Sequence, residues 1–218
     1  MKLLLISASL REIEEAYELG VFAGTASNPA VVARSRTTAE NLVKEYVASF
    51  QAPIFVQVTS LETSGMVAEG LRLASLAPNR VIIKVPATVC GIRAIHQLSQ
   101  SDVPTAATAI FNASEALLGA LAGAAYVAPY YARIDDSSHD ADEVLKSILD
   151  LSRIHGLGTQ VIAASMRSQN DLLAAYSAGA HYSAIEWSVV QEAFADDRCA
   201  RAAEKFFEQA QSHTQESL

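Results

Sequence analysis

Short apolar runs alternate with longer segments that have helical periodicity along the whole chain. The runs are apolar throughout instead of alternating with polar residues, which is typical of strands that are buried on both faces. The predicted strands are Lys2–Ile6, Val21–Ala26, Ile54–Thr59, Arg80–Val85, Thr105–Ala109, Ala125–Ala128, Thr159–Ala164 and Tyr182–Ile185.

Amphipathic segments between these runs predict helices, and one more such segment, Arg198–Ser212, follows the last of them. Eight strand–helix repeats in 218 residues favour a (β/α)8 TIM barrel, an α/β fold, over an open doubly wound sheet. We expect a single domain over residues 1–218 with an extra C-terminal helix. The predicted helices are Leu10–Glu18, Thr38–Ser49, Thr63–Leu76, Cys90–Ser99, Ala113–Leu121, Ala141–Ile154, Asn170–Ser177 and Val189–Phe194.

Charge and composition narrow the classes of partner. The net charge is −8 and no basic run is present, so nucleic acid is not expected as a partner, whereas a small anion needs only one or two arginines. No apolar stretch approaches the length of a membrane span, and the apolar start of the chain is too short for a signal peptide. Cys90 and Cys199 fit neither a disulfide framework nor a metal site, which indicates two reduced thiols in a cytoplasmic protein. We expect no metal and no cofactor.

One lysine stands inside a predicted strand. Four of the five lysines lie in polar or amphipathic surroundings, but Lys84 follows Val81-Ile82-Ile83. Burial disfavours the charged form of an amine and lowers its pKa, and a neutral amine can attack a carbonyl to form an imine. Lys84 also lies near the C-terminal end of its strand, where barrel enzymes place their active sites. The alternative is an inward lysine that is paired with a carboxylate for structural reasons alone.

Polar residues also lie at or near the ends of other predicted strands. Each is weak alone, because such residues are usually caps or turn formers. Their convergence on one face of a barrel would be a stronger signal of a site. They are Asn28, Gln57, Thr108, Tyr130, Arg133, Ser165 and Arg167.

With Lys84 in Val-Ile-Ile-Lys-Val-Pro-Ala-Thr, the chain resembles the transaldolase superfamily of class I aldolases, and most closely its short fructose-6-phosphate aldolase branch. The resemblance covers nearly the whole chain. It implies a (β/α)8 barrel in which Lys84 forms a Schiff base. Further matching motifs are Ser27-Asn28-Pro29-Ala30, Phe55-Val56-Gln57-Val58, Ala128-Pro129-Tyr130, Arg133-Ile134-Asp135 and Ala163-Ala164-Ser165-Met166-Arg167.

The resemblance also implies roles for the other residues. Gln57, Thr108 and Tyr130 would hold a catalytic water, and the phenol and this water would act as general acid and base. Asn28, in the Ser27-Asn28 motif, would bind a hydroxyl of the donor. A substrate phosphate would be bound by Arg133 and Ser165, with Arg167 as a helper.

An assembly and a substrate class follow from the same resemblance. It implies a ring-shaped homo-oligomer in which the C-terminal helix docks on a neighbour. Phe206 and Phe207 could anchor that helix, or could pack on their own barrel. The substrates would be small carbonyl compounds, sugars or sugar phosphates.

Differences from relatives at five positions bear on the kind of reaction and on the donor. True transaldolases have Glu where Gln57 stands and Ser-Pro-Phe where this chain has Ala128-Pro129-Tyr130, so the chain favours aldol cleavage and addition over group transfer. The family Asp at the end of the first strand is replaced by Ile6, and a Thr of the second strand by Ala26. Ile6, Ala26 and Ala128 would therefore give the donor pocket an apolar wall that suits a less hydroxylated donor such as hydroxyacetone.

Other readings stay open beside the aldolase. They are a transferase of a three-carbon ketol unit, merely impaired cleavage of the usual sugars, and a non-catalytic barrel. A phosphate-binding isomerase would not need a buried lysine in its fourth strand. The acidic segment from Asp136 to Asp140 also replaces a glycine-rich loop of relatives, which argues against tight phosphate recognition.

Overall fold

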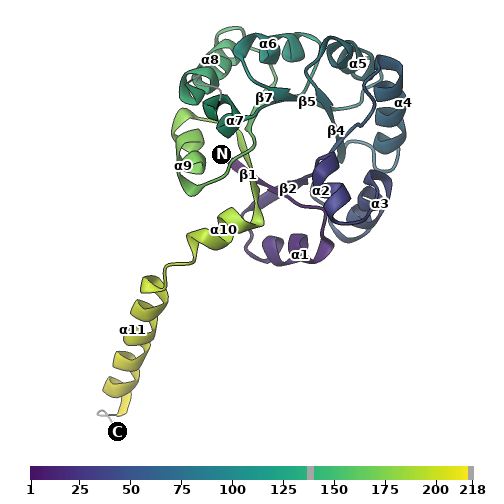
Figure 1. Cartoon of the computed structure of the whole chain (residues 1–218). Coiled ribbons are helices and arrows are strands. Elements are labelled where there is room, and N and C mark those ends of the chain that lie inside the picture. Colours follow the sequence, from purple (N-terminus) through teal and green to yellow (C-terminus); the bar gives the residue numbers. More distant parts are fainter. Residues whose placement is uncertain (137–139, 216–218) are drawn as a thin grey trace.

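The computed structural model describes residues 1–136 and 140–215, with side chains up to residue 211, and its centre is a closed parallel barrel (Figure 1). Each strand pairs with the next along the chain, and β8 closes the ring on β1. The predicted TIM barrel is therefore confirmed. The strands are β1 Lys2–Ile6, β2 Phe22–Ala26, β3 Ile54–Gln57, β4 Val81–Pro86, β5 Thr105–Ile110, β6 Tyr126–Pro129, β7 Gln160–Ala163 and β8 Tyr182–Glu186.

Helices follow the strands and form the outer ring. Side-chain caps define the start of most of them, as where Thr88 accepts a hydrogen bond from the Gly91 amide. The long helices are α1 Leu10–Glu18, α3 Ala39–Ser49, α4 Thr63–Ala74, α5 Val89–Ser99, α6 Ala113–Leu121, α8 Ala141–Ile154, α9 Gln169–Ala178 and α10 Trp187–Ala193.

Two short helices at the C-terminal end of the barrel strands were not predicted. They are α2 Pro29–Arg34 and α7 Tyr131–Asp136, each of six residues directly after a strand. Asn28 caps α2 by accepting from the Val31 amide, and Pro29 occupies its first turn, where its missing N–H does no harm. Both helices therefore lie beside the ends of the strands that carry the predicted site residues.

Alternate side chains of each strand point into the barrel. This two-residue alternation determines which residues face the site. Leu4, Phe55 and Ile82 belong to the cluster that fills the barrel interior. Two residues further along the same strands come Ile6, Gln57 and Lys84, which consequently face inward at the C-terminal end. The strand registers place these residues at the same level as their neighbours, because Gln57 pairs with Lys84 and Ile6 pairs with Glu186.

The last helix, α11 Arg198–Gln215, extends away from the barrel (Figure 1). It continues beyond the predicted end at Ser212. Its residues from Arg198 to Gln211 are exposed, and Phe206 and Phe207 expose 68% and 65% of their surface. The helix therefore presents two aromatic rings that its own barrel does not cover.

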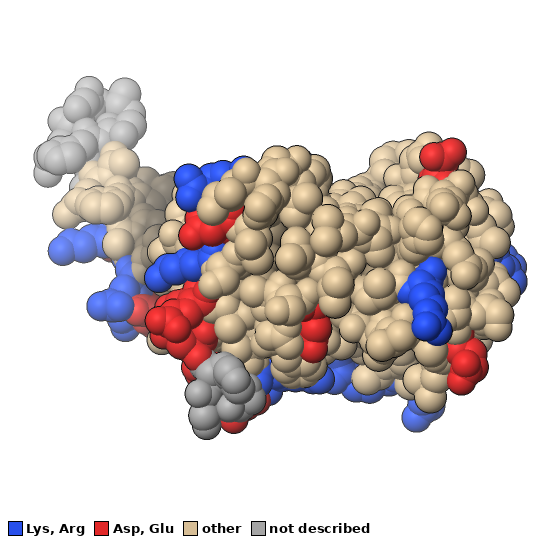
Figure 2. Space-filling model, turned by 90° about the horizontal axis from the view of Figure 1, so that it is seen from above, with Lys and Arg blue, Asp and Glu red and all other residues tan. Residues whose placement is uncertain are grey.

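The surface has no dominant basic region on the face drawn in Figure 2, where acidic and basic side chains are interspersed among uncharged ones. Within residues 1–136 and 140–215, no helix is both long and apolar enough to cross a membrane.

Candidate active site

A cavity of about 370 Å³ opens at the C-terminal end of the barrel. The strands and the loops that follow them supply its walls, which is the usual place of an active site in this fold. The lining residues are Ile6, Ala26, Asn28, Lys84, Tyr130, Arg133, Ala164, Ser165, Met166, Arg167, Ala184, Glu186, Ser188 and Val189.

Lys84 carries the only amine among these lining residues. Its Nζ donates a hydrogen bond to the backbone carbonyl of Ser27, 2.8 Å away. In the described part of the chain no carboxylate forms an ion pair with Lys84, which removes the alternative of a structural charge pair. Burial lowers the pKa of Lys84 from 10.5 to about 8, so its neutral form is accessible near neutral pH.

Thr108 and Tyr130 approach each other beside the cavity. The Thr108 hydroxyl lies 3.5 Å from the Tyr130 phenol, a long hydrogen bond. The register of β5 shifts directly after Thr108, where Ala109 adopts a positive φ of 56°. This bulge re-aims the end of the strand, as bulges next to active sites often do. Thr108 itself is fully buried and does not line the cavity.

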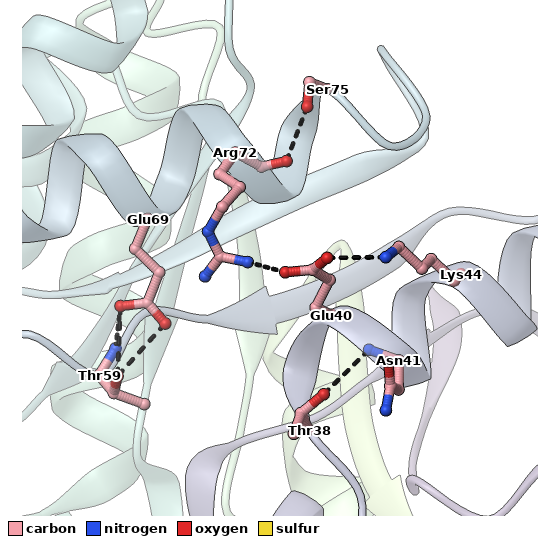
Figure 3. A network of polar contacts seen from close by, with 8 residues as sticks. All are labelled: Thr38, Glu40, Asn41, Lys44, Thr59, Glu69, Arg72 and Ser75. Atoms are coloured by element: carbon pink, nitrogen blue, oxygen red, sulfur yellow. Dashed lines mark hydrogen bonds and ion pairs between the residues drawn. The ribbon is translucent and has the colours of Figure 1, made fainter.

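Gln57 faces the barrel interior at the level of Lys84. Its Oε1 atom is buried and has no hydrogen-bond partner within the described residues, which is uncommon for a buried polar atom. The loop after it is held in place, because the carboxylate of Glu69 on α4 accepts from the amide and hydroxyl of Thr59 (Figure 3). In the same view Arg72 of α4 contacts Glu40 of α3, which also accepts from Lys44. The loop after β3 is thus tied to α4, which in turn contacts α3.

Asn28 and Ser27 take different positions although they are adjacent. Asn28 lines the cavity, with its Oδ1 occupied by the cap of α2 and its amide nitrogen without a hydrogen-bond partner among the described residues. The Ser27 side chain is fully buried and its hydroxyl donates to the Phe55 carbonyl over 3.5 Å. Ser27 therefore reaches Lys84 only through its backbone carbonyl, and its predicted contact with substrate has no support from its side chain.

Two arginines border the cavity on the side of β6 and β7. The guanidinium of Arg133 stacks on the Tyr130 ring, 4.9 Å from its centre. Arg167 instead makes a paired contact with the carboxylate of Asp136. Between them Ser165 adopts a left-handed backbone with φ of 61°, a strained conformation of the kind found at functional sites.

The apolar wall that the sequence predicts is divided between two cavities. Ile6 and Ala26 line the main cavity. Ala128 instead lines a small inner cavity of about 20 Å³, which Lys84 and Ala26 also border. The wall beside the amine is therefore apolar at all three predicted positions.

Glu186 and Arg34 form a part of the site that the sequence did not reveal. Glu186 ends β8, lines the cavity, and lies 3.5 Å from Arg34 of α2. Its inward position follows from the two-residue period, since Ala184 lies on the inner face. Extending strand eight by one residue would have found Glu186, but nothing in the sequence pairs it with Arg34.

Comparison with known proteins agrees with the fold and the cavity. The family model described as transaldolase/fructose-6-phosphate aldolase matches residues 5–217. A probable transaldolase of Geobacillus kaustophilus (strain HTA426) is 36% identical over 206 residues, which cover 94% of this chain and 96% of that protein. A probable transaldolase of Heliobacterium modesticaldum (strain ATCC 51547 / Ice1) is 38% identical over 192 residues, or 88% and 89% of the two chains. The chain therefore belongs to the transaldolase/fructose-6-phosphate aldolase family, whose members are enzymes of the aldolase or transferase kind.

Proposed function

We propose that the protein is a class I aldolase that cleaves and forms a ketose, such as fructose 6-phosphate, through a Schiff base on Lys84. The observation that carries this proposal is a buried amine, without a carboxylate partner in the described residues, in the cavity at the C-terminal end of the barrel. Such an amine is nucleophilic without the help of a metal or cofactor.

The chemistry has two stages. The Lys84 amine adds to the substrate carbonyl, and loss of water gives a protonated imine. A base then removes a proton from the hydroxyl on the far side of the scissile C–C bond. The bond electrons flow into the imine, and an aldehyde leaves while an enamine stays on Lys84. Protonation of the enamine and hydrolysis release the ketone and restore the amine.

We assign the proton transfers to Tyr130, supported by Thr108 and Gln57 through a water that the three would hold. The distance of 3.5 Å between Thr108 and Tyr130 and the buried Oε1 of Gln57 favour this assignment. Gln57 together with Tyr130 also favours an aldolase over a transferase. A phenol at this position can protonate the enamine, whereas a phenyl ring would leave it waiting for an acceptor.

We assign substrate contacts to four cavity residues. The amide nitrogen of Asn28 would donate to a hydroxyl of the donor. The guanidinium of Arg133 and the hydroxyl of Ser165 would bind the distal end of the ketose, where Arg167 would assist. This division follows the lining of the cavity, to which Lys84 and the two arginines contribute.

The donor is proposed to carry few hydroxyl groups. Ile6, Ala26 and Ala128 offer no hydrogen bond beside the amine, so a second donor hydroxyl would be buried without a partner. Hydroxyacetone should therefore react faster than dihydroxyacetone. A rate with dihydroxyacetone that equals or exceeds the rate with hydroxyacetone would argue against this donor preference.

The test of the activity is release of glyceraldehyde 3-phosphate from fructose 6-phosphate, measured with the wild type and with Lys84→Met. An aldolase releases the aldehyde continuously without an added aldehyde acceptor. The rival transferase of a three-carbon ketol unit would turn over only when an acceptor is added. No release from any ketose, with or without acceptor, would favour a non-catalytic barrel.

We further propose a cytoplasmic homo-oligomer. The exposed Phe206 and Phe207 on α11 give a reason for association, since an apolar pair on a projecting helix is stabilised by burial. The free thiols Cys90 and Cys199 fit a reducing compartment.

A further inference from the structure

A carboxylate occupies both terminal nitrogens of Arg167, one of the two arginines that line the cavity. Asp136 is the last residue of α7, and Arg167 lies between β7 and α9. The two terminal nitrogens of Arg167 donate to the two carboxylate oxygens of Asp136 over 3.0 and 2.7 Å. Hydrogen bonding to Arg167 lowers the pKa of Asp136, and the same contact raises the pKa of Arg167.

This parallel, two-pronged geometry is also the one by which an arginine holds a phosphate. The backbone amide of Arg167 is occupied as well, because it donates to the carboxylate of Asp171 over 2.8 Å. A second anion at Arg167 would therefore meet two negative groups, one from α7 and one from α9.

The neighbouring arginine has a different environment. Arg133 stacks on Tyr130, and within residues 1–136 and 140–215 it forms no ion pair with a carboxylate, although it lies close enough for its charge to act on Asp136. Of the two arginines that line the cavity, Arg167 is thus the one that is held in an ion pair by its own chain.

We propose that Asp136 is a specificity-determining residue, which occupies the fork of Arg167 and so favours uncharged carbonyl substrates over phosphorylated ones. A phosphate that uses Arg167 must displace the carboxylate or bind beside it, whereas the hydroxymethyl end of an unphosphorylated sugar meets no such repulsion. This inference rests on the proposed function, whose cavity and lysine it uses, and it narrows the substrate class.

The ion pair itself can be removed with little disturbance. Both side chains are more than half exposed, at 55% for Arg167 and 56% for Asp136, and exposed pairs contribute little to folding. Asp136→Asn keeps the shape of the side chain and one acceptor oxygen while it removes the charge. The variant should fold as the wild type does, which circular dichroism and thermal melting would verify.

The experiment compares kcat and KM of the wild type and Asp136→Asn on fructose 6-phosphate and on fructose. We expect kcat/KM for fructose 6-phosphate to rise about tenfold, chiefly through a lower KM, while that for fructose changes by less than twofold. Inorganic phosphate should likewise inhibit cleavage of fructose about tenfold more strongly in the variant.

Asp150→Asn is the matched control. Asp150 forms an exposed pair with Arg153 on α8, 2.8 Å apart, and lines neither the cavity nor its rim. The Asp150→Asn variant carries the same change of net charge, and its kcat/KM should differ from that of the wild type by less than twofold for either substrate.

Two outcomes overturn the inference and can be told apart. If the wild type is active and Asp136→Asn changes kcat/KM equally for both substrates, or for neither, Asp136 does not set specificity, while the proposed function stands. If the wild type cleaves no ketose and forms no adduct on Lys84, the proposed function fails and the inference fails with it.

Discussion

The Lys84 amine donates to the carbonyl of Ser27, and burial lowers its pKa from 10.5 to about 8. No nearby charge is needed for this shift, since desolvation alone disfavours the ammonium form. With a pKa near 8, about a tenth of the amine is neutral at pH 7, roughly 300-fold more than at a pKa of 10.5. The site thus obtains its nucleophile from the apolar surroundings of one strand.

The first prediction is the pH dependence of imine formation. The reactive form is the deprotonated amine, so the rate of adduct formation should rise from pH 6 and level off above a midpoint near 8. The rate is measured by cyanoborohydride trapping with hydroxyacetone and mass spectrometry of the Lys84 peptide. Adduct on the exposed Lys146 in the same digest reports non-specific reaction. A midpoint near 10.5 would show that burial does not activate the amine.

The second prediction concerns Tyr130. Tyr130→Phe removes the phenolic hydroxyl and should lower the rate of ketose cleavage by about 10² to 10⁴-fold, the range typical of a lost general acid or base. The Lys84 adduct should still form. Added aldehyde should restore part of the turnover, because the enamine then has an acceptor.

Tyr131→Phe provides the control, since the Tyr131 hydroxyl bonds to Asp142 on α8, 2.6 Å away, and does not line the cavity. Its activity should stay within about threefold of the wild type. Equal losses in the two variants would mean that the Tyr130 phenol has no special part in proton transfer.

At the scale of elements, β4 and α5 approach each other closely just after the lysine. A Cβ at Gly91 would lie only 1.8 Å from the carbonyl oxygen of Pro86, the last residue of β4. Thr88 caps α5 through the amide of the same glycine, over 3.0 Å. The absence of a side chain at Gly91 therefore lets the helix begin directly beside the strand end that carries Lys84.

The third prediction follows from this contact. Gly91→Ala should lower the free energy of unfolding by about 1–3 kcal/mol and reduce cleavage, because β4 or α5 must shift. Urea unfolding and an activity assay measure the two effects. Gly158→Ala is the control, since a Cβ there meets nothing within 4 Å. Equal stability of the two variants would contradict the account of this contact.

The strands and the long helices, which form the core, could be predicted from the sequence. The short helices beside the site could not. Continuous apolar runs marked the strands, and amphipathic periodicity marked the long helices. The six-residue helices α2 and α7 carry too little periodicity to be detected, and tertiary contacts stabilise them. The inward Lys84 was evident from its apolar neighbours. The pairs Arg34–Glu186 and Asp136–Arg167 were not, because they join segments that are far apart in the sequence and that only the closed barrel brings together.

The whole molecule consists of a barrel and a projecting helix, and the two have different roles. The barrel buries its own core and contains the cavity. The helix α11 adds no residue to that cavity and exposes Phe206 and Phe207. Its apolar side chains are therefore available to a second copy of the chain.

The fourth prediction tests that role. Phe206→Ser combined with Phe207→Ser should convert an oligomer into smaller species or monomers, measured by light scattering coupled to size exclusion, while the barrel stays folded. Leu118→Ser on α6, which removes another exposed apolar side chain, serves as the control and should leave the mass unchanged. A wild-type mass equal to that of one chain would contradict the proposed assembly.

Borohydride trapping shows whether Lys84 forms a covalent bond with a carbonyl substrate. The protein is incubated separately with fructose 6-phosphate, dihydroxyacetone, hydroxyacetone and acetaldehyde, reduced, and analysed by intact mass and peptide mapping. We expect a mass gain on the peptide of Lys84, strongest with hydroxyacetone and absent from Lys84→Met. Folded wild-type protein that gains no mass on Lys84 with any of the four compounds would contradict the proposed covalent role of Lys84.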